Sequence, residues 1–235
     1  MAEPVSVLYE DNHLIAVNKQ AGQIVQGDKT GDIPLSALVA EYLRITYKKP
    51  GDAFIGVIHR IDRPVSGVVL FARTSKGLSK MNELFRSRAV KKTYWALVEG
   101  KVTQESGTLV NYLSKNEEKN TSRALTEPRE GYLRCELNFK VLEVLDNYTL
   151  LEVDPLTGRH HQIRVQLSAA GWPIKGDVKY GARRGNADRS ICLHARSVSF
   201  EHPVKKEAVC IESPAPESWP LPGSGSDSSG KPAAR

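Results

Sequence analysis

The sequence predicts an α+β fold with a mixed, mainly antiparallel central sheet and flanking helices. Two observations lead to this prediction: strand-like segments outnumber helical ones, and several strand-like segments follow one another through short turns. The chain has 235 residues, of which 40% are hydrophobic and 26% charged. This composition is ordinary for a globular domain with a substantial core.

The residue pattern in the first half of the sequence predicts strands that alternate with two helices. Two short strands lie within residues 6–22, around an Asp-Asn turn. Residues 32–47 are expected to be helical because Leu35, Val39 and Leu43 recur on one face. The further elements are a strand at 68–73, a helix at 74–88 and a strand at 91–100.

The second half predicts mostly strands. Residues 132–153 contain two strands joined by a second Asp-Asn turn, and a final pair of strands occupies 191–203 and 208–213. We interpret the segment that begins at His160 as extended. Residues 1–212 are expected to form a single domain, and residues 213–235, rich in Pro, Ser and Gly, a disordered tail.

The charge of the chain favours an anionic partner such as nucleic acid. The net charge is +6 and the isoelectric point about 9.2. The three cysteines form no CxxC pair, which argues against a disulfide framework and fits a reducing cytoplasm. The first residues carry no signal-peptide core, and no run approaches the roughly 18 apolar residues that a membrane span needs.

The segment "HRIDRPVSG", residues 59–67, places an aspartate between two arginines. Opposite charge from Arg60 and Arg63 is expected to keep Asp62 ionised, and an ionised carboxylate can act as a nucleophile, a base or an ion-pair partner. Taken alone, the segment favours a structural ion pair that holds a turn.

Motifs for cofactors and metals are missing from the sequence. There is no phosphate-binding P-loop, no GxGxxG and no HExxH. His160 and His161 are neighbours, but side chains adjacent in a strand point to opposite faces, so the pair is not expected to share a metal ion. We therefore expect neither a metal nor a cofactor.

Five segments carry further motifs in a fixed order. They are "IAVNKQAG", "HRIDRPVSG", "KKTYWALVEG", "TGRHHQIRVQL" with its continuation "AAGWPIKGDVKYG", and "CLHA", within residues 6–212. In this combination they resemble the motifs of the RluA-type family of RNA pseudouridine synthases. The chain departs from the family pattern at Gln20, Ile61 and Val65, where proline, leucine and threonine are usual.

The resemblance implies the pseudouridine synthase fold and an isomerase that converts uridines in RNA to pseudouridine without a cofactor. It implies that Asp62 is the catalytic carboxylate, either as a nucleophile toward the sugar or base or as a base at C2′. It also implies that Tyr94 packs on the target uracil and handles a proton at C5, and that Arg164 pairs with the aspartate.

Basic side chains are expected to hold the RNA around a uridine that has left its stack. Extruding a nucleotide costs a few kcal/mol, and stacking on an aromatic ring returns roughly 1–3 kcal/mol per base. The resemblance implies that Arg60 helps to displace the base. The RNA-binding candidates are Arg60, Lys19, Arg159, His160, Arg183 and Arg184.

The expected partner is a stem-loop of ribosomal or transfer RNA, bound by a monomer. Without an N-terminal RNA-binding module, specificity must come from the surface of the catalytic domain. The main alternative is a non-catalytic RNA-binding protein on the same fold. A glycosidic-bond hydrolase is a weaker alternative, because such enzymes usually use two carboxylates. A purely structural role has the least support.

Overall fold

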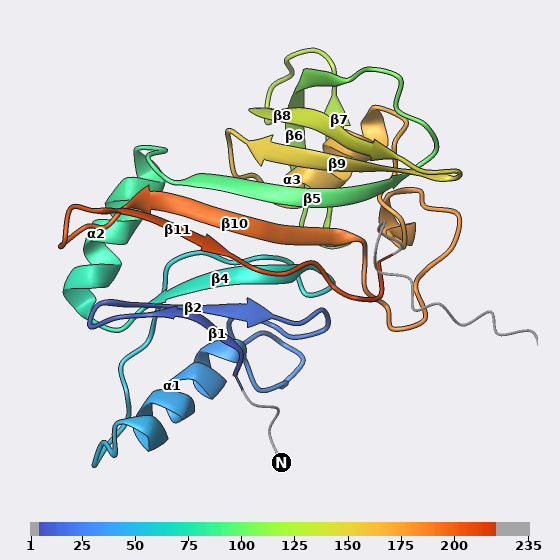
Figure 1. Cartoon of the computed structure of the whole chain (residues 1–235). Helices are drawn as coiled ribbons and strands as arrows, with labels where there is room; N and C mark the ends of the chain where they lie inside the picture. Colours follow the sequence, from blue (N-terminus) through green and yellow to red (C-terminus); the bar gives the residue numbers. More distant parts are fainter. Residues whose placement is uncertain (1–4, 220–235) are drawn as a thin grey trace, which may run out of the picture.

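The computed structural model describes residues 5–219, which form one twisted sheet of 11 strands with helices packed against it (Figure 1). The strands are β1 (Val7–Glu10), β2 (Leu14–Lys19), β3 (Gly56–Val57), β4 (Ser66–Ala72), β5 (Lys91–Glu99), β6 (Ser106–Asn116), β7 (Thr121–Leu125), β8 (Leu133–Val144), β9 (Tyr148–Pro155), β10 (Leu193–Glu201) and β11 (Ala208–Glu212). The helices are α1 (Leu35–Thr46), α2 (Ser75–Arg86), α3 (Gln162–Ala169) and the short 3-10 helix η1 (Val178–Tyr180). The predicted α+β class is confirmed.

The sheet runs in the order β1-β2-β4-β10-β5-β9-β8-β6-β7, with β3 on β4 and β11 on β10. Strand β10 is parallel to β4, and the other strand pairs of the described residues are antiparallel. The predicted mainly antiparallel sheet is therefore confirmed. Because β10 returns from the end of the chain to pair with both β4 and β5, it joins the two halves of the molecule.

Gly67 allows β4 and β10 to approach each other closely. Its φ of +112° lies in the region that side chains rarely adopt, and an added Cβ would lie 2.3 Å from the carbonyl oxygen of Ala195. The glycine of "HRIDRPVSG" is thus required by strand pairing. It fixes where the loop that carries Asp62 ends and the sheet begins.

Alternate side chains of β2 enter two different hydrophobic clusters. Ile15 and Val17 pack in the larger cluster, which also contains Val39 of α1. Leu14 and Ala16 pack in the smaller cluster with Met81 of α2. The strand is therefore buried on both faces, and the period of two places α1 and α2 on opposite sides of this part of the sheet.

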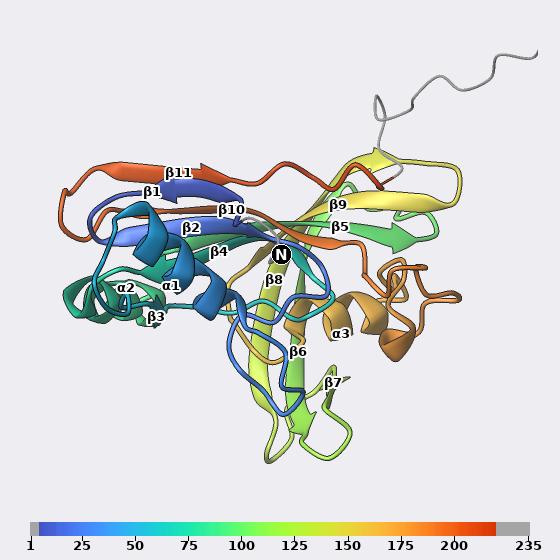
Figure 2. The same cartoon turned by 90° about the horizontal axis from the view of Figure 1, so that it is seen from below.

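Strands β6 and β7 were not foreseen from the sequence. Together with β8 they turn away from the other strands and form a projecting arm (Figure 2). Most residues of β6 are exposed or half-buried, so the segment lacks the apolar alternation that marks a strand with one buried face.

The interpretation of residues 160–171 as extended is wrong, because the structure has helix α3 from Gln162 to Ala169. The sequence "QIRVQL" alternates polar and apolar residues as a strand does. All six are nevertheless buried, since the polar ones find hydrogen-bond partners inside the protein. Burial of polar side chains hides the helical period.

The predicted boundary of a tail at residue 213 is too early. Ser213 is fully buried, and Trp219 packs in the larger hydrophobic cluster beside the ring of His194. The remainder of the predicted tail, residues 220–235, lies outside the described residues. Cys135, Cys192 and Cys210 are free thiols. No helix within residues 5–219 is long and apolar enough to cross a membrane.

Candidate active site

A cavity of about 1060 Å³ lies where the two halves of the sheet meet. The N-terminal half supplies the loop at 24–30 and the loop at 59–65, and the other half supplies β5 and the segment from Pro155 to Arg164. Asp62, Tyr94 and Arg164, which are far apart in the sequence, all line this space. The three catalytic candidates are therefore brought together.

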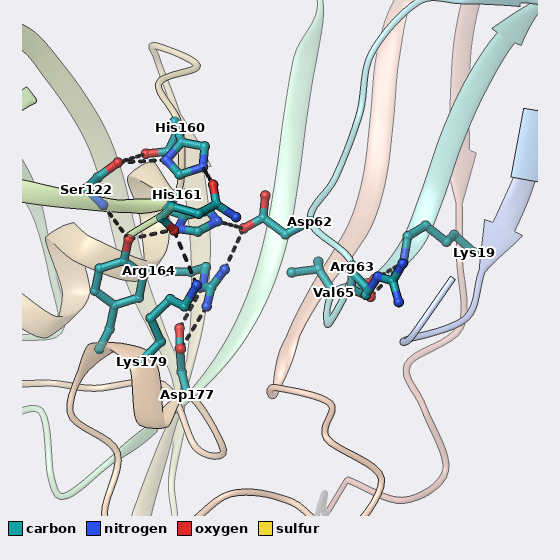
Figure 3. A network of polar contacts seen from close by, with 12 residues as sticks. Lys19, Asp62, Arg63, Val65, Ser122, His160, His161, Arg164, Asp177 and Lys179 are labelled. Atoms are coloured by element: carbon teal, nitrogen blue, oxygen red, sulfur yellow. Dashed lines mark hydrogen bonds and ion pairs between the residues drawn. The ribbon is translucent and has the colours of Figure 1, made fainter. Parts of the chain in front are cut away.

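Asp62 enters the cavity from the loop between β3 and β4, and its side chain is 30% exposed. Its Oδ2 accepts a hydrogen bond of 2.9 Å from Nη1 of Arg164 (Figure 3). No side chain among residues 5–219 donates to Oδ1 within hydrogen-bond range. One carboxylate oxygen is thus held, and the other is open to the cavity.

The arginines next to Asp62 in the sequence are not its partners. Arg63 turns away and forms an ion pair of 2.6 Å with Asp32, and Arg60 is exposed. The ion pair within this segment, which the segment taken alone favours, is therefore not formed. Side chains adjacent in an extended or turning chain point in different directions, so the partner comes from α3, 102 residues away.

Arg164 is itself fixed by a buried carboxylate. Its Nε and Nη2 donate to the two oxygens of Asp177 at 2.7 and 2.9 Å, and both side chains are at most 5% exposed. Burial alone would lower the pKa of Arg164, but the hydrogen bonds and charge of Asp177, together with Asp62, raise it. The guanidinium stays charged, and its two-pronged bond to Asp177 sets the direction of Nη1.

The loop before α3 is shaped by Gln162. Its Oε1 accepts hydrogen bonds from Oγ1 of Thr157 and the backbone N–H of Arg159, and its Nε2 donates to the carbonyl oxygen of Glu136. His161 then adopts a left-handed conformation with φ of +52°. These hydrogen bonds and the left-handed residue turn the chain from β9 into α3, where it lines the cavity.

His160 and His161 stack with their ring centroids 3.7 Å apart. The expectation that their side chains point to opposite faces is wrong, because it assumed a strand where His161 has positive φ. Their stacking does not by itself make a metal site. Among residues 5–219 there is no group of three His, Cys, Asp or Glu side chains that could hold a metal ion. The expected absence of a metal remains a prediction.

Tyr94 lies on β5, where it pairs with Ala195 of β10 and Val153 of β9. Burial raises the pKa of its hydroxyl, and the negative charge of Asp62 raises it further. The side chain therefore meets a substrate as a neutral phenol. A neutral ring on a rigid central strand is well suited to pack against a base.

Lys19 does not lie on an RNA-facing surface, contrary to the prediction. It is fully buried, and its Nζ donates to the carbonyl oxygens of Gln20, Arg63 and Val65 at 2.9, 3.1 and 2.7 Å. Burial lowers the pKa of Lys19 to about 7, against the opposing effect of Asp62. The side chain holds the loop that carries Asp62 from behind.

The departures from the family pattern fit these surroundings. Val65 and Ile61 pack in the hydrophobic core, so an apolar side chain fits both positions. The backbone N–H of Gln20 donates to Oε1 of Gln23, a bond that a proline would not make.

The other RNA-binding candidates fall into two groups. Arg60, Arg159 and His160 line the cavity, whereas Arg183 and Arg184 are exposed on a loop outside it. His160 is held by Ser122 and Asn120 through its two ring nitrogens. Three basic residues that line the cavity were missed by the sequence analysis, namely Lys92, Lys115 and Lys179.

Asp177, His161 and Tyr180 are further parts of the site that were not foreseen from the sequence. All three lie in segments that were matched to the family, "TGRHHQIRVQL" and "KGDVKYG", but no role was assigned to them. Asp177 could have been noticed as an acidic residue within a basic loop. A buried arginine such as Arg164 needs several hydrogen-bond acceptors, and a nearby carboxylate is the natural one.

The fold is that of known pseudouridine synthases. Human RNA pseudouridylate synthase domain containing 1 superposes with a TM-score of 0.73 at 28% identity, over 92% of this chain and 85% of that chain. Human RNA pseudouridylate synthase domain containing 4 superposes with a TM-score of 0.75 over 90% of this chain and 88% of the other; at 22% identity it supports the fold alone.

Comparison of the sequence with known proteins identifies the family of this chain. A family model described as RNA pseudouridylate synthase matches residues 13–169. Ribosomal large subunit pseudouridine synthase C of Vibrio parahaemolyticus is 35% identical over 215 residues, which are 88% of this chain and 65% of that protein. The protein of the same name from Escherichia coli is 36% identical over 90% of this chain and 66% of its own length. This chain belongs to the RNA pseudouridylate synthase family, and it spans about two thirds of these relatives.

Proposed function

We propose that the protein is an RNA pseudouridine synthase, an isomerase that converts specific uridines in structured RNA to pseudouridine with Asp62 as its catalytic carboxylate. The observation that carries this proposal is the state of that carboxylate. One of its oxygens is held by the buried Arg164, and the other faces a cavity of about 1060 Å³.

The reaction is an isomerisation, so its atoms balance without water or an electron carrier. The bond from N1 of uracil to C1′ breaks, the base turns, and a bond from C5 to C1′ forms. The proton on C5 leaves, and N1 gains one. Asp62 acts either as a nucleophile toward the sugar or base or as a base at C2′, and the open Oδ1 serves both routes.

The cavity accommodates a nucleotide that has left its stack. Tyr94 offers an aromatic face, which offsets part of the few kcal/mol that extrusion costs. Arg60 and Arg159 line the cavity and are exposed, which supports contact with RNA: we assign Arg60 to displacement of the base and Arg159 to a flanking phosphate. Because Tyr94 is neutral, its hydroxyl can handle the C5 proton only as a relay, which releases its own hydrogen toward N1 or solvent as it takes up the one from C5.

Ribosomal RNA of the large subunit is the substrate that we favour, because relatives such as the Vibrio parahaemolyticus protein carry that activity in their names. Transfer RNA is the second candidate. A non-catalytic RNA-binding protein is the alternative function, but a carboxylate at the centre of the cavity would repel phosphates and serves no purpose in such a protein.

The test is to map pseudouridine by carbodiimide-based sequencing in cells with the gene, without it, and complemented with Asp62→Asn. We expect specific sites in ribosomal or transfer RNA to disappear on deletion and to return with the unaltered gene but not with Asp62→Asn. If every site persists after deletion, or returns with Asp62→Asn, the proposal fails.

We further propose that the protein works as a monomer in the cytoplasm. One chain supplies every residue of the cavity described above, and the three cysteines are free, as in a reducing compartment. Light scattering of the purified protein tests the first point, and fluorescent tagging of the chromosomal gene tests the second.

A further inference from the structure

A chain of polar contacts leads from β7 to the carboxylate of Asp62 (Figure 3). The backbone N–H of Ser122 lies 2.7 Å from the hydroxyl oxygen of Tyr180, and that hydroxyl lies 2.8 Å from Nδ1 of His161. Nε2 of His161 lies 3.5 Å from Oδ2 of Asp62. The His161 and Tyr180 side chains are nearly buried, so water does not compete for these contacts.

The direction of each hydrogen in this chain follows from the groups present. A backbone N–H can only donate, so the oxygen of Tyr180 accepts from Ser122. Among residues 5–219 the Tyr180 hydroxyl has no other acceptor within hydrogen-bond range than Nδ1 of His161, so its own hydrogen points to that nitrogen. A neutral imidazole carries one hydrogen, which must then be on Nε2. Burial lowers the pKa of His161 to about 3, so the ring is neutral at physiological pH.

We propose that His161, with its tautomer fixed by Tyr180, is a positioning residue for Asp62: its Nε2–H and Nη1 of Arg164 both hold Oδ2, which leaves Oδ1 as the reacting oxygen. This inference rests on the proposed function. The contact of 3.5 Å is longer than the 2.9 Å bond from Arg164, and hydrogen bonds of this kind tighten when substrate enters the site.

Tyr180 contacts both groups that hold the carboxylate. Its hydroxyl binds His161, and its ring faces the guanidinium of Arg164 at 5.0 Å from the centroid. Tyr180→Phe keeps the ring over Arg164 and removes only the hydroxyl. This substitution therefore separates the effect of the tautomer from the effect of packing.

A role limited to packing is the alternative. In that case His161 would only support the stacked ring of His160, and the position of its hydrogen would not matter. The two readings differ in what the Tyr180 hydroxyl does to the chemical step, because stacking does not depend on it.

The first measurement needs no RNA. Nitrogen-15 spectra of the histidine side chains in the full chain should show His161 as the neutral tautomer with its hydrogen on Nε2. Tyr180→Phe should shift His161 toward a mixture of tautomers. Tyr42→Phe is the matched control: it removes the hydrogen bond from the Tyr42 hydroxyl on α1 to Glu10 of β1 and should leave the His161 signals unchanged. His161 found with its hydrogen on Nδ1, or doubly protonated, would overturn the inference.

The second measurement is the single-turnover rate of pseudouridine formation on ribosomal RNA isolated from cells that lack the gene. We expect Tyr180→Phe to lower the rate about fivefold to tenfold and His161→Leu more strongly, with unchanged RNA affinity; a tenfold fall equals about 1.4 kcal/mol of barrier. His161→Gln, which keeps an N–H near the place of Nε2, should recover part of the loss. This variant keeps the test informative if His161→Leu fails to fold.

The outcomes distinguish this inference from the proposed function. If the unaltered protein converts uridine but Tyr180→Phe and His161→Gln react at the unaltered rate, the positioning role is wrong and the proposed function stands. If the unaltered protein converts no uridine in either ribosomal or transfer RNA, the proposed function fails, and the role of His161 fails with it whatever its tautomer.

Discussion

One loop contains two regions of opposite character, although its sequence is basic and rich in glycine throughout. Within residues 175–182, Asp177 and Tyr180 turn inward: they are 1% and 8% exposed, and both contact Arg164. Residues 183–189 turn outward, and the side chain of Arg183 is 92% exposed. The inward side chains support Arg164 and through it Asp62, whereas the exposed arginines of the outward half are the ones that we expect to meet RNA.

The difference teaches that the surroundings of a charged side chain decide its role. A buried charged side chain orients its partner, because its hydrogen bonds allow only one geometry. An exposed arginine attracts phosphates by its charge, and dissolved salt screens this attraction. Substitutions in the inward network should therefore change the chemical step, and substitutions in the outward half should change RNA affinity.

The largest effect is expected at the end of the inward network. Asp62→Asn keeps the shape of the side chain but removes its charge, so turnover should fall by about 10³-fold or more. The fold and the RNA affinity should stay close to those of the unaltered protein. Single-turnover assays, circular dichroism and RNA titration check the three parts. Turnover within tenfold of the unaltered rate would show that another group does the chemistry.

Arg164→Met is expected to have the next largest effect. Loss of the bond to Oδ2 lets the carboxylate move, and a displacement of about 1 Å can lower the rate about 10²-fold. RNA affinity should change little, since Arg164 is buried. The measurement is the single-turnover rate beside the dissociation constant.

Arg164→Lys is the companion variant, because it keeps the charge beside Asp177 but loses the two-pronged geometry. It should also be slow, although it should unfold at a higher temperature than Arg164→Met. Weaker RNA binding with an unchanged rate in either variant would place Arg164 in the outward class.

Lys19→Met should affect stability more than chemistry. The substitution removes the Nζ donor from three carbonyl oxygens. Those of Gln20 and Arg63 keep a backbone N–H, from Gln23 and Gly22, so the main loss is at the buried carbonyl oxygen of Val65. A buried group left unsatisfied costs about 1–3 kcal/mol. Thermal unfolding measures the loss. Lys101→Met removes the same charge from an exposed position and serves as the control, with no change in melting temperature expected.

Lys19 should contribute to the pH dependence of the free energy of unfolding of the unaltered protein. The pKa of Lys19 is lowered from 10.5 when unfolded to about 7 when folded, so between these values the unfolded state binds more protons. The contribution of this group to stability therefore rises with pH across that window. Unfolding free energies at pH 7 and pH 9 should diverge between the unaltered protein and Lys19→Met. Parallel behaviour of the two proteins would show that Lys19 is not titrating in this range.

The smallest effect is expected in the outward half of the loop. Neutralising Arg183 and Arg184 should leave the single-turnover rate unchanged and weaken RNA binding. Each lost phosphate contact should flatten the salt dependence of binding by about 0.7–0.9 units of slope. Lys48 and Lys49, exposed at the end of α1, give a control with the same loss of charge. Equal slopes for the two double variants would mean that the loop makes no specific phosphate contact.

The sequence by itself determined the elements that carry a clear local signal. The helical period of Leu35, Val39 and Leu43 follows from burial of one face of α1, and the short apolar run of β2 beside an Asp-Asn turn indicates a strand. The structure places both as predicted. The resemblance of five motifs also indicated the family, together with Asp62, Tyr94 and Arg164 as residues that meet in one cavity.

Tertiary structure alone decided the polar interior. The partner of Asp62 comes from α3 and not from the arginines beside it, Lys19 faces backbone carbonyls and not RNA, and a buried run of alternating residues is a helix. Each of these depends on which polar group a distant segment brings within hydrogen-bond range. A buried polar side chain is stable only beside its partner, and the pairing of β10 with both β4 and β5 determines where the partners lie.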